Sequence, residues 1–134
     1  MSAPDDVEAI ARLHERWVSA VGTGDFDALT PLVTDDYEVW AHAADPIRGP
    51  AAVAAAMRAV LGSYRVEQRF EPVETVIAGE WAFQRGVERI IVTPMDGSAA
   101  RTITQRALLI LRRGGDGRWR YARGMTNGFP PHAS

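Results

Sequence analysis

The chain has 134 residues, 46% of them hydrophobic and 24% charged, which fits a single globular domain with one core over residues 1–134. Its formal net charge of −2 offers no basic field to a phosphate backbone or an anionic membrane, so we expect no nucleic-acid and no membrane partner. Cysteine and lysine are both absent, which excludes disulfides, thiolate metal sites and lysine Schiff bases. The acidic, polar N-terminus differs from a signal peptide, and we expect a cytoplasmic protein.

The N-terminal half reads as two helices with a strand between them. Apolar residues at helical spacing predict a helix from Asp6 to Val21, with Asp5 or Asp6 as its N-terminal cap. Residues 34–36, Thr-Asp-Asp, are expected to form a turn before a strand from Tyr37 to Ala43. A second, alanine-rich helix is predicted from Ala51 to Leu61.

The C-terminal half reads as a meander of long strands. Residues 64–77 predict one strand, and three more β-rich segments follow from Gly79 onward, joined by turn sequences at residues 95–98 and 114–117. Helices followed by a meander predict an α+β fold in which a curled antiparallel sheet wraps around the N-terminal helices. Such a cone has a mouth, where a pocket is expected.

This order of elements, together with five short motifs, resembles the nuclear transport factor 2-like superfamily and, within it, the small bacterial SnoaL-like domains. The motifs are GDFDAL at residues 24–29, TDD at 34–36, RGPAAV at 48–53, GEWAFQRG at 79–86 and DGRWRYAR at 116–123. The resemblance implies a cystatin-like cone, or α+β barrel, with a hydrophobic pocket. Relatives include ketosteroid isomerase, scytalone dehydratase, limonene epoxide hydrolase and polyketide cyclases, but also non-enzymatic binding and assembly domains, so the motifs imply a fold more closely than an activity.

Ketosteroid isomerase provides a specific test of activity within that resemblance. Counted along this chain, its oxyanion tyrosine falls on Trp17, its catalytic aspartate on Ala41 and its second oxyanion residue on or near Leu109. An isomerase of that type needs a carboxylate to move the proton and donors to hold the oxyanion. None of the three positions carries such a group, so we do not expect that specific activity.

The faces of the strands decide which residues reach the pocket. On the last strand, bulk alone would turn Trp119, Tyr121, Arg123 and Met125 inward, whereas the resemblance implies that residues 122, 124 and 126 are concave. We follow the resemblance, because small residues leave room for a ligand. The residues then expected in the pocket are Trp17, Tyr37, Val39, Ala41, Gln84, Gln105, Leu109, Thr126 and Asn127.

Three residues are candidates for catalysis by acid or base chemistry. Glu88 is the candidate base on the concave face, although an ion pair with Arg106 or another strand arginine would explain it as well. His14 shares a helix face with Trp17, and its alternative is a bond to a backbone carbonyl or to water. His42 would need a β-bulge to turn inward. The three histidines of the chain show no His-x-His or i, i+4 spacing, so we expect no metal site and no cofactor.

The convex side of the sheet is expected to form a homodimer. By the register taken from the resemblance, Trp119, Tyr121 and Arg123, with Arg106 beside them, would form an aromatic and arginine-rich surface that a second subunit would cover.

Two functions follow from these observations. One is a cofactor-free enzyme of the isomerase, cyclase or dehydratase type, acting on an apolar carbonyl or polyketide-like molecule. The other is a non-catalytic ligand-binding or dimeric assembly domain.

Overall fold

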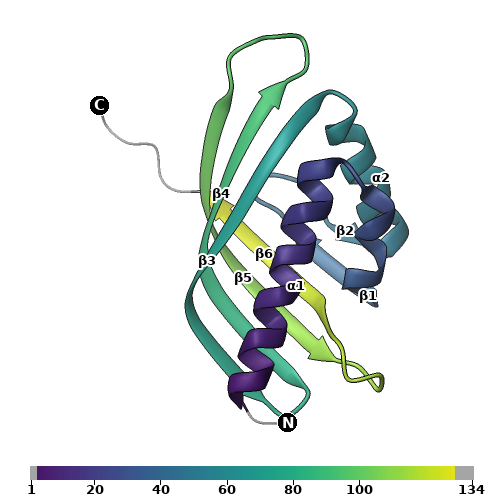
Figure 1. Ribbon diagram of the computed structural model, residues 1–134, viewed down its shortest axis with the longest axis vertical. Helices are drawn as coiled ribbons and strands as arrows, with labels where there is room; N and C mark the ends of the chain where they lie inside the picture. The colour runs from purple at the N-terminus through teal and green to yellow at the C-terminus, as the bar shows by residue number, and fades with distance from the viewer. Residues whose placement is uncertain (1–2, 129–134) are drawn as a thin grey trace.

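The computed structural model describes residues 3–128 and shows two helices against one face of a curled sheet (Figure 1). The α+β class predicted from the sequence is confirmed. Within the described residues, no helix is long and apolar enough to cross a membrane. The elements in chain order are α1 (Ala3–Thr23), η1 (Phe26–Ala28), η2 (Thr30–Leu32), β1 (Val33–Trp40), β2 (Ile47–Arg48), α2 (Pro50–Leu61), β3 (Tyr64–Ala78), β4 (Trp81–Pro94), β5 (Arg101–Arg113) and β6 (Trp119–Gly128).

The sheet has six strands in the order β2-β1-β6-β5-β4-β3 and does not close into a barrel. All neighbours pair antiparallel except β1 and β6, which are parallel. The antiparallel pairing expected from the sequence is present throughout the meander, and the β1–β6 pair departs from it. A parallel pair requires a long connection, and here the chain passes through α2 and the whole meander between the two strands.

The strand β1 begins earlier than the sequence predicted. Residues 34–36, expected as a turn, lie within the bounds of β1, but the pairing of β1 with β6 shifts register between Val33, which pairs with Tyr121, and Glu38, which pairs with Arg123. The predicted continuation to Ala43 is also wrong, since β1 ends at Trp40. The two aspartates expected in a turn therefore lie where the pairing of β1 with β6 is irregular.

One end of the cone is closed by a buried polar cluster around Asp6. This residue lies inside α1 rather than at its cap and is 3% exposed. Its Oδ1 accepts hydrogen bonds from the Arg113 guanidinium (3.1 Å) and from the Trp119 indole N–H (3.2 Å). The Arg113 guanidinium also lies over the Trp119 ring, 5.5 Å from its centre. The first turns of α1 are in this way fixed to the ends of β5 and β6.

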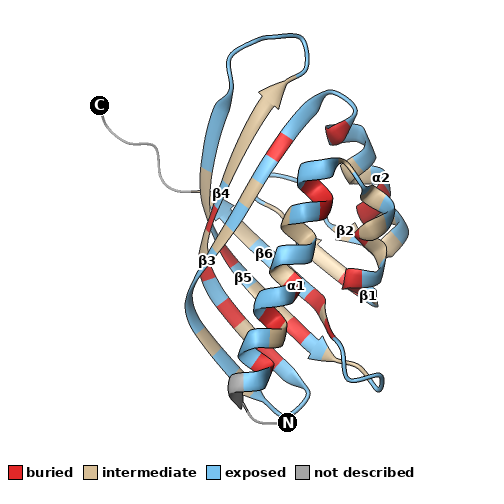
Figure 2. Ribbon diagram, viewed as in Figure 1, coloured by how far each residue is buried: buried red, intermediate tan, exposed pale blue. Residues whose placement is uncertain are grey.

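A β-bulge in β6 corrects the register that we expected for the last strand. Leu111 pairs with Tyr121 and Ile110 with Arg123, so Ala122 is left without a partner and the side chains exchange faces there. Trp119 and Tyr121 are 5% and 6% exposed and belong to the core, so their assignment to a dimer interface is wrong. Buried residues occur on α1 and on the strands that it covers (Figure 2). Side-chain size correctly predicted that Trp119 and Tyr121 point inward. The family resemblance correctly predicted that Gly124 and Thr126, beyond the bulge, lie on the concave face.

Candidate functional site

A cavity of about 370 Å³ lies between the two helices and the concave face of the sheet. Most of its wall is apolar, with Val39 and Leu109 from the sheet and Met57 from α2. Of the residues expected in the pocket, most line this cavity. They are Trp17, Tyr37, Val39, Ala41, Gln105, Leu109 and Thr126, together with the three candidate catalytic residues His14, His42 and Glu88.

Glu88 lies on β4 with its carboxylate held from both sides. Gln68 Nε2 donates a hydrogen bond to its Oε2 (2.9 Å), and Gln105 Nε2 donates to its Oε1 (2.7 Å). Gln68 is itself oriented by the Trp17 indole, whose N–H donates to Gln68 Oε1 (3.1 Å). Arg106 lies on the other, exposed side of β5, so the hydrogen bonds to this carboxylate come from neutral amides rather than from the expected ion pair. Amides fix its position without adding a counter-charge.

His14 bridges α1 to the sheet through both ring nitrogens. Its Nε2 lies 2.5 Å from Gln84 Oε1 and its Nδ1 lies 2.5 Å from the Tyr121 hydroxyl. Burial lowers the pKa of His14 below its ordinary value of 6.5, although the hydrogen bond to Gln84 acts in the opposite direction. In the neutral ring, Nε2–H donates a hydrogen bond to the Gln84 amide oxygen, which leaves Nδ1 as an acceptor. The Tyr121 hydroxyl therefore donates a hydrogen bond to Nδ1.

Gln84 holds His14 from behind rather than facing the cavity. It is 3% exposed, and its Nε2 donates to Thr75 Oγ1 (3.0 Å), which fixes the amide with its oxygen toward the imidazole. Its assignment to the pocket is therefore corrected to a supporting position. Asn127 is exposed because it has the opposite parity from Thr126 on β6, so its assignment to the pocket is wrong.

The Tyr37 hydroxyl is a polar group in the wall of the cavity that can still form a hydrogen bond to a ligand. The side chain is 7% exposed, and its hydroxyl makes no hydrogen bond to any described residue. Burial first, and the nearby Glu88 carboxylate second, raise the pKa of Tyr37 well above 10, so the hydroxyl keeps its proton. A side chain at Gly124 would come within 3.7 Å of this hydroxyl, and the glycine keeps that space free.

The mouth of the cavity includes His42, which follows the end of β1. Its backbone N–H donates to Thr126 Oγ1 (2.9 Å), and its ring lies over Gly128, where a Cβ atom would come within 3.4 Å. His42 is exposed, so it contacts the cavity at the rim. Among residues 3–128, no group of three or more acidic or histidine side chains is placed to hold a metal ion.

The comparisons with known proteins agree with this geometry. A family model described as a SnoaL-like domain matches residues 14–122. The chain belongs to the SnoaL-like domain family. No curated protein matches it at a significant level.

Several solved structures are similar to this SnoaL-like domain. A conserved protein from Planctomyces limnophilus is 29% identical, with a TM-score of 0.86 over 93% of this chain and 98% of its own. An NTF2-like protein with a cystatin-like fold from Novosphingobium aromaticivorans is 23% identical, with a TM-score of 0.80 over 96% and 85%. A ketosteroid isomerase-like protein from Erwinia carotovora atroseptica is 22% identical, with a TM-score of 0.78 over 92% and 96%. The last two show the fold alone.

The three positions counted from ketosteroid isomerase do fall in the cavity of this SnoaL-like domain. Trp17, Ala41 and Leu109 all line it, and none of them supplies a carboxylate. Ionisable groups come instead from other positions, among them Glu88 on β4 and Tyr37 on β1.

Among the residues of the cavity that the sequence reasoning missed, three contact the candidate catalytic groups or lie beside them. Gln68 and Phe70 lie on β3, and the alternation Val66-Gln68-Phe70 could have placed them on the same face as Glu88. Phe70 also depends on Gly86, where a Cβ atom would come within 2.8 Å of its ring. The third, Tyr121, was assigned to the opposite face because the bulge was not foreseen.

Proposed function

We propose that this SnoaL-like domain is a cofactor-independent enzyme that moves a proton on a small, largely apolar molecule bearing a carbonyl group. The observation that carries the proposal is the open Tyr37 hydroxyl, which lies in one apolar cavity with the Glu88 carboxylate. One group can accept a proton from carbon and the other can donate a hydrogen bond to oxygen. An apolar wall with a few convergent polar groups is usual for sites that bind small organic molecules.

The reaction that fits these groups starts at a carbon next to the carbonyl. Glu88 takes a proton from that carbon, and the negative charge moves onto the carbonyl oxygen, where the Tyr37 O–H stabilises it. In an isomerisation, Glu88 returns the proton to another carbon. In a dehydration, it gives the proton to the departing hydroxyl, which leaves as water. In a cyclisation, the enolate carbon attacks a second carbonyl of the same molecule, and Glu88 gives the proton to the oxygen of that carbonyl. Gln68 and Gln105 hold the carboxylate in place during the transfer. A polyketide-like substrate fits this class.

Exchange of hydrogen for deuterium tests the first step without knowledge of the natural substrate. A panel of apolar ketones is incubated with the protein in deuterated buffer, and exchange beside the carbonyl is followed by NMR. We expect Glu88→Gln to reduce the rate about 10² to 10⁴-fold, because general base catalysis typically contributes that much. We expect Tyr37→Phe to reduce it about 10² to 10³-fold, as for one lost oxyanion donor.

Glu67→Gln is the matched control, because this glutamate is exposed on β3 and does not line the cavity. It should leave the exchange rate unchanged. Should every ketone exchange at the rate of buffer alone, or should Glu88→Gln exchange as fast as the wild type, the enzymatic proposal would be wrong.

The alternative, a dimeric assembly domain, is favoured by an apolar row on the convex face of the sheet. Trp40 pairs with Met125, and Met125 pairs with Leu108, so the three side chains lie side by side on neighbouring strands. They are 52%, 46% and 39% exposed, respectively. We propose that a second copy of the chain covers this row, with exposed Arg106 and Arg123 at its border, in place of the interface expected around Trp119.

Sedimentation velocity tests the dimer. We expect the wild type to sediment as a dimer at micromolar concentration and Met125→Glu as a monomer, because a charge placed at the centre of a symmetric apolar contact has no partner. Met95→Glu changes another exposed methionine, 58% exposed, that lies outside the row, and this variant should remain dimeric. A wild type that is monomeric, or a Met125→Glu variant that stays dimeric, would contradict this interface.

A further inference from the structure

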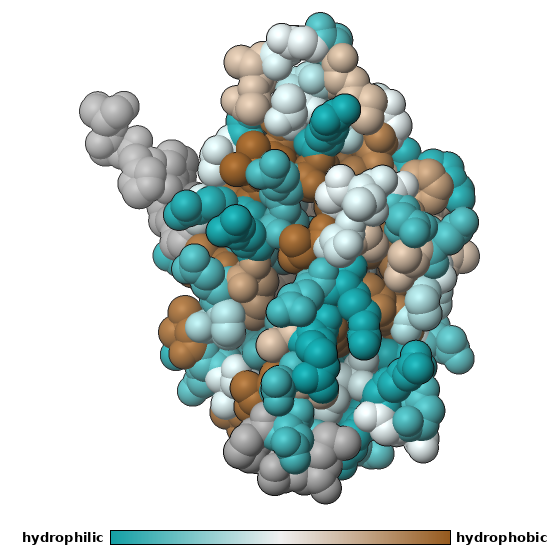
Figure 3. Space-filling model, in the orientation of Figure 1, coloured by the Kyte–Doolittle hydropathy of each residue, from teal (hydrophilic) through white to brown (hydrophobic). Residues whose placement is uncertain are grey.

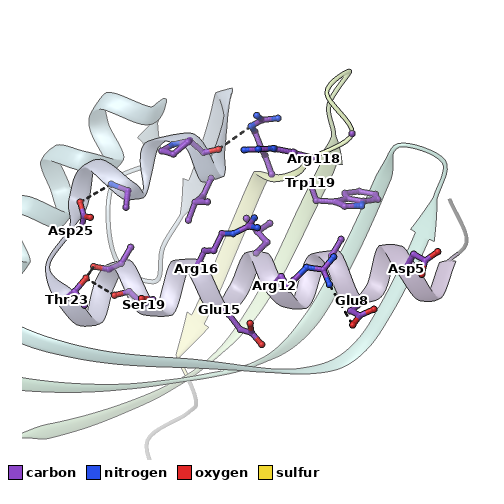
Figure 4. Close-up of a pocket in the computed structure, with 18 residues that line it drawn as sticks. Asp5, Glu8, Arg12, Glu15, Arg16, Ser19, Thr23, Asp25, Arg118 and Trp119 are labelled. Atoms are coloured by element: carbon purple, nitrogen blue, oxygen red, sulfur yellow. Dashed lines mark hydrogen bonds and ion pairs between the residues drawn. The ribbon is translucent and has the colours of Figure 1, made fainter.

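A second concavity lies outside the cavity, on the solvent side of α1, and has a volume of about 1100 Å³ (Figure 4). Its walls are α1, the short helices η1 and η2, and the hairpin that leads into β6. We call this concavity the α1 groove. Its floor is built of core side chains, Leu13, Leu32 and Trp119, which are 2%, 8% and 5% exposed. The groove is therefore part of the folded body, although Figure 3 shows mainly hydrophilic residues over the exposed side of α1.

Arginines line the α1 groove from two directions. Arg12 and Arg16 are one turn apart on α1, and Arg118 and Arg120 come from the hairpin side. Arg120 is fixed in place, since its guanidinium holds both oxygens of Asp116 (2.7 and 3.1 Å) and its Nε donates to the Pro31 carbonyl (3.2 Å). It shapes the wall of the groove rather than offering a free charge.

Two other arginines line the groove with guanidinium groups that no carboxylate holds directly, although the charge of Arg118 acts on the nearby Asp116, the partner of Arg120. Neither the Arg16 nor the Arg118 guanidinium makes a hydrogen bond or ion pair with a described residue, although both line the same groove. Arg12 makes only a long contact of 3.7 Å with Glu8, and both of those side chains are more than half exposed. Surface pairs of this kind contribute little and exchange readily.

The acidic residues of the α1 groove lie mostly at its ends. Asp5 and Glu8 lie near the N-terminal end of α1 and Asp25 lies beyond its C-terminal end, while Glu15 points away from Arg16 (Figure 4). Arginines in the middle of the groove attract a small anion there. The carboxylates at its ends repel a long polyanion that would extend over them. Guanidinium groups match the oxygens of phosphate with paired hydrogen bonds.

We propose that the α1 groove binds a compact oxyanion, phosphate or the phosphate group of a small ester, between Arg16 and Arg118. This site is separate from the cavity of Glu88, on the opposite side of α1, and does not depend on the enzymatic proposal. The two guanidinium groups supply the paired donors, and the apolar floor keeps water from one side of the anion.

Calorimetric titration at constant ionic strength tests the site, with inorganic phosphate and phenyl phosphate as the probes. We expect one anion to bind per chain with millimolar affinity, and Arg16→Gln and Arg118→Gln each to weaken binding about tenfold, the effect of losing one charge-assisted hydrogen bond. Arg89→Gln is the matched control, because this arginine is exposed on β4 outside the groove, and it should bind like the wild type.

The ratio of the two probes identifies the source of the anion. Tighter binding of phenyl phosphate supports a phosphate ester, and equal binding supports free phosphate. A heparin oligosaccharide should bind no tighter than phosphate. The proposal is wrong if the wild type binds neither probe, if Arg89→Gln weakens binding as much as Arg16→Gln, or if the oligosaccharide binds tighter through Arg16.

Discussion

The two halves of β6 face the same helix-covered side of the sheet but are built from opposite kinds of residue. In the first half, Trp119 and Tyr121 fill the space under α1 and are almost completely buried. In the second half, beyond the bulge at Ala122, Gly124 and Thr126 leave that space open as the cavity. One extra residue in the strand thus separates the part of the cone that holds the fold together from the part that can take a ligand.

The two buried carboxylates differ in the same way. Asp6, in the closed half, accepts hydrogen bonds from an arginine and an indole, so its charge is balanced within the protein. Glu88, in the open half, accepts hydrogen bonds from two glutamines, which carry no charge. A carboxylate that neutral donors hold in the wall of a cavity can contact a bound ligand, whereas a carboxylate paired with an arginine serves the structure.

The largest expected difference between the closed and the open half of the cone is in how much a substitution lowers the free energy of unfolding. Trp119→Ala should lower the free energy of unfolding by about 3–5 kcal/mol, because it opens a cavity in packed core and removes a partner of Asp6. Leu109→Ala, in the wall of the open half, should cost about 1–2 kcal/mol, since part of that side chain already faces empty space. Denaturant unfolding measures both. Equal losses would contradict the division into a closed and an open half.

The two tyrosines of the cavity provide a sharper test. Tyr121→Phe should lower the free energy of unfolding by about 1–3 kcal/mol, because it leaves His14 Nδ1 without its buried donor. Tyr37→Phe should change it by less than about 0.5 kcal/mol, since its hydroxyl has no partner among the described residues. Denaturant unfolding of the two variants, side by side, decides the matter. If Tyr37→Phe were the more damaging, its hydroxyl would have a structural partner.

A smaller effect is expected from pH, through His14. Because burial lowers the pKa of His14 in the folded protein, the unfolded chain binds more protons below pH 6.5. The neutral ring of His14 contributes its whole share of the folding stability above pH 6.5. That share is lost as the pH falls from 6.5 to the lower pKa of His14 in the folded protein, and the loss is about 1.4 kcal/mol for each unit of pKa shift.

The measurement is the free energy of unfolding at pH 7.5 and at pH 5.5. We expect His14→Gln to lose less stability than the wild type between the two values. His42→Gln changes the exposed histidine at the rim and should keep the wild-type loss. An unchanged loss in His14→Gln would show that the ring does not carry this pH dependence.

The sequence by itself determined the class of fold and much of the concave face. Helical spacing in α1, turn residues between β4, β5 and β6, and regular alternation on β4 and β5 depend on neighbours in the chain, so they can be read locally. Alternation placed Glu88 and Gln105 correctly in the cavity for that reason.

Only the tertiary structure decided the features that depend on distant partners. The parallel pairing of β1 with β6 joins strands at opposite ends of the chain, and the residues expected in a turn lie within β1, where that pairing shifts register. The bulge at Ala122 arises where β6 must satisfy the Asp6 cluster at one end and the cavity at the other. The partners of His14, Gln84 and Tyr121, are 70 and 107 residues away from it. Contacts of such separation leave no periodic signal in the sequence, because each is fixed by the packing of the helix on the sheet.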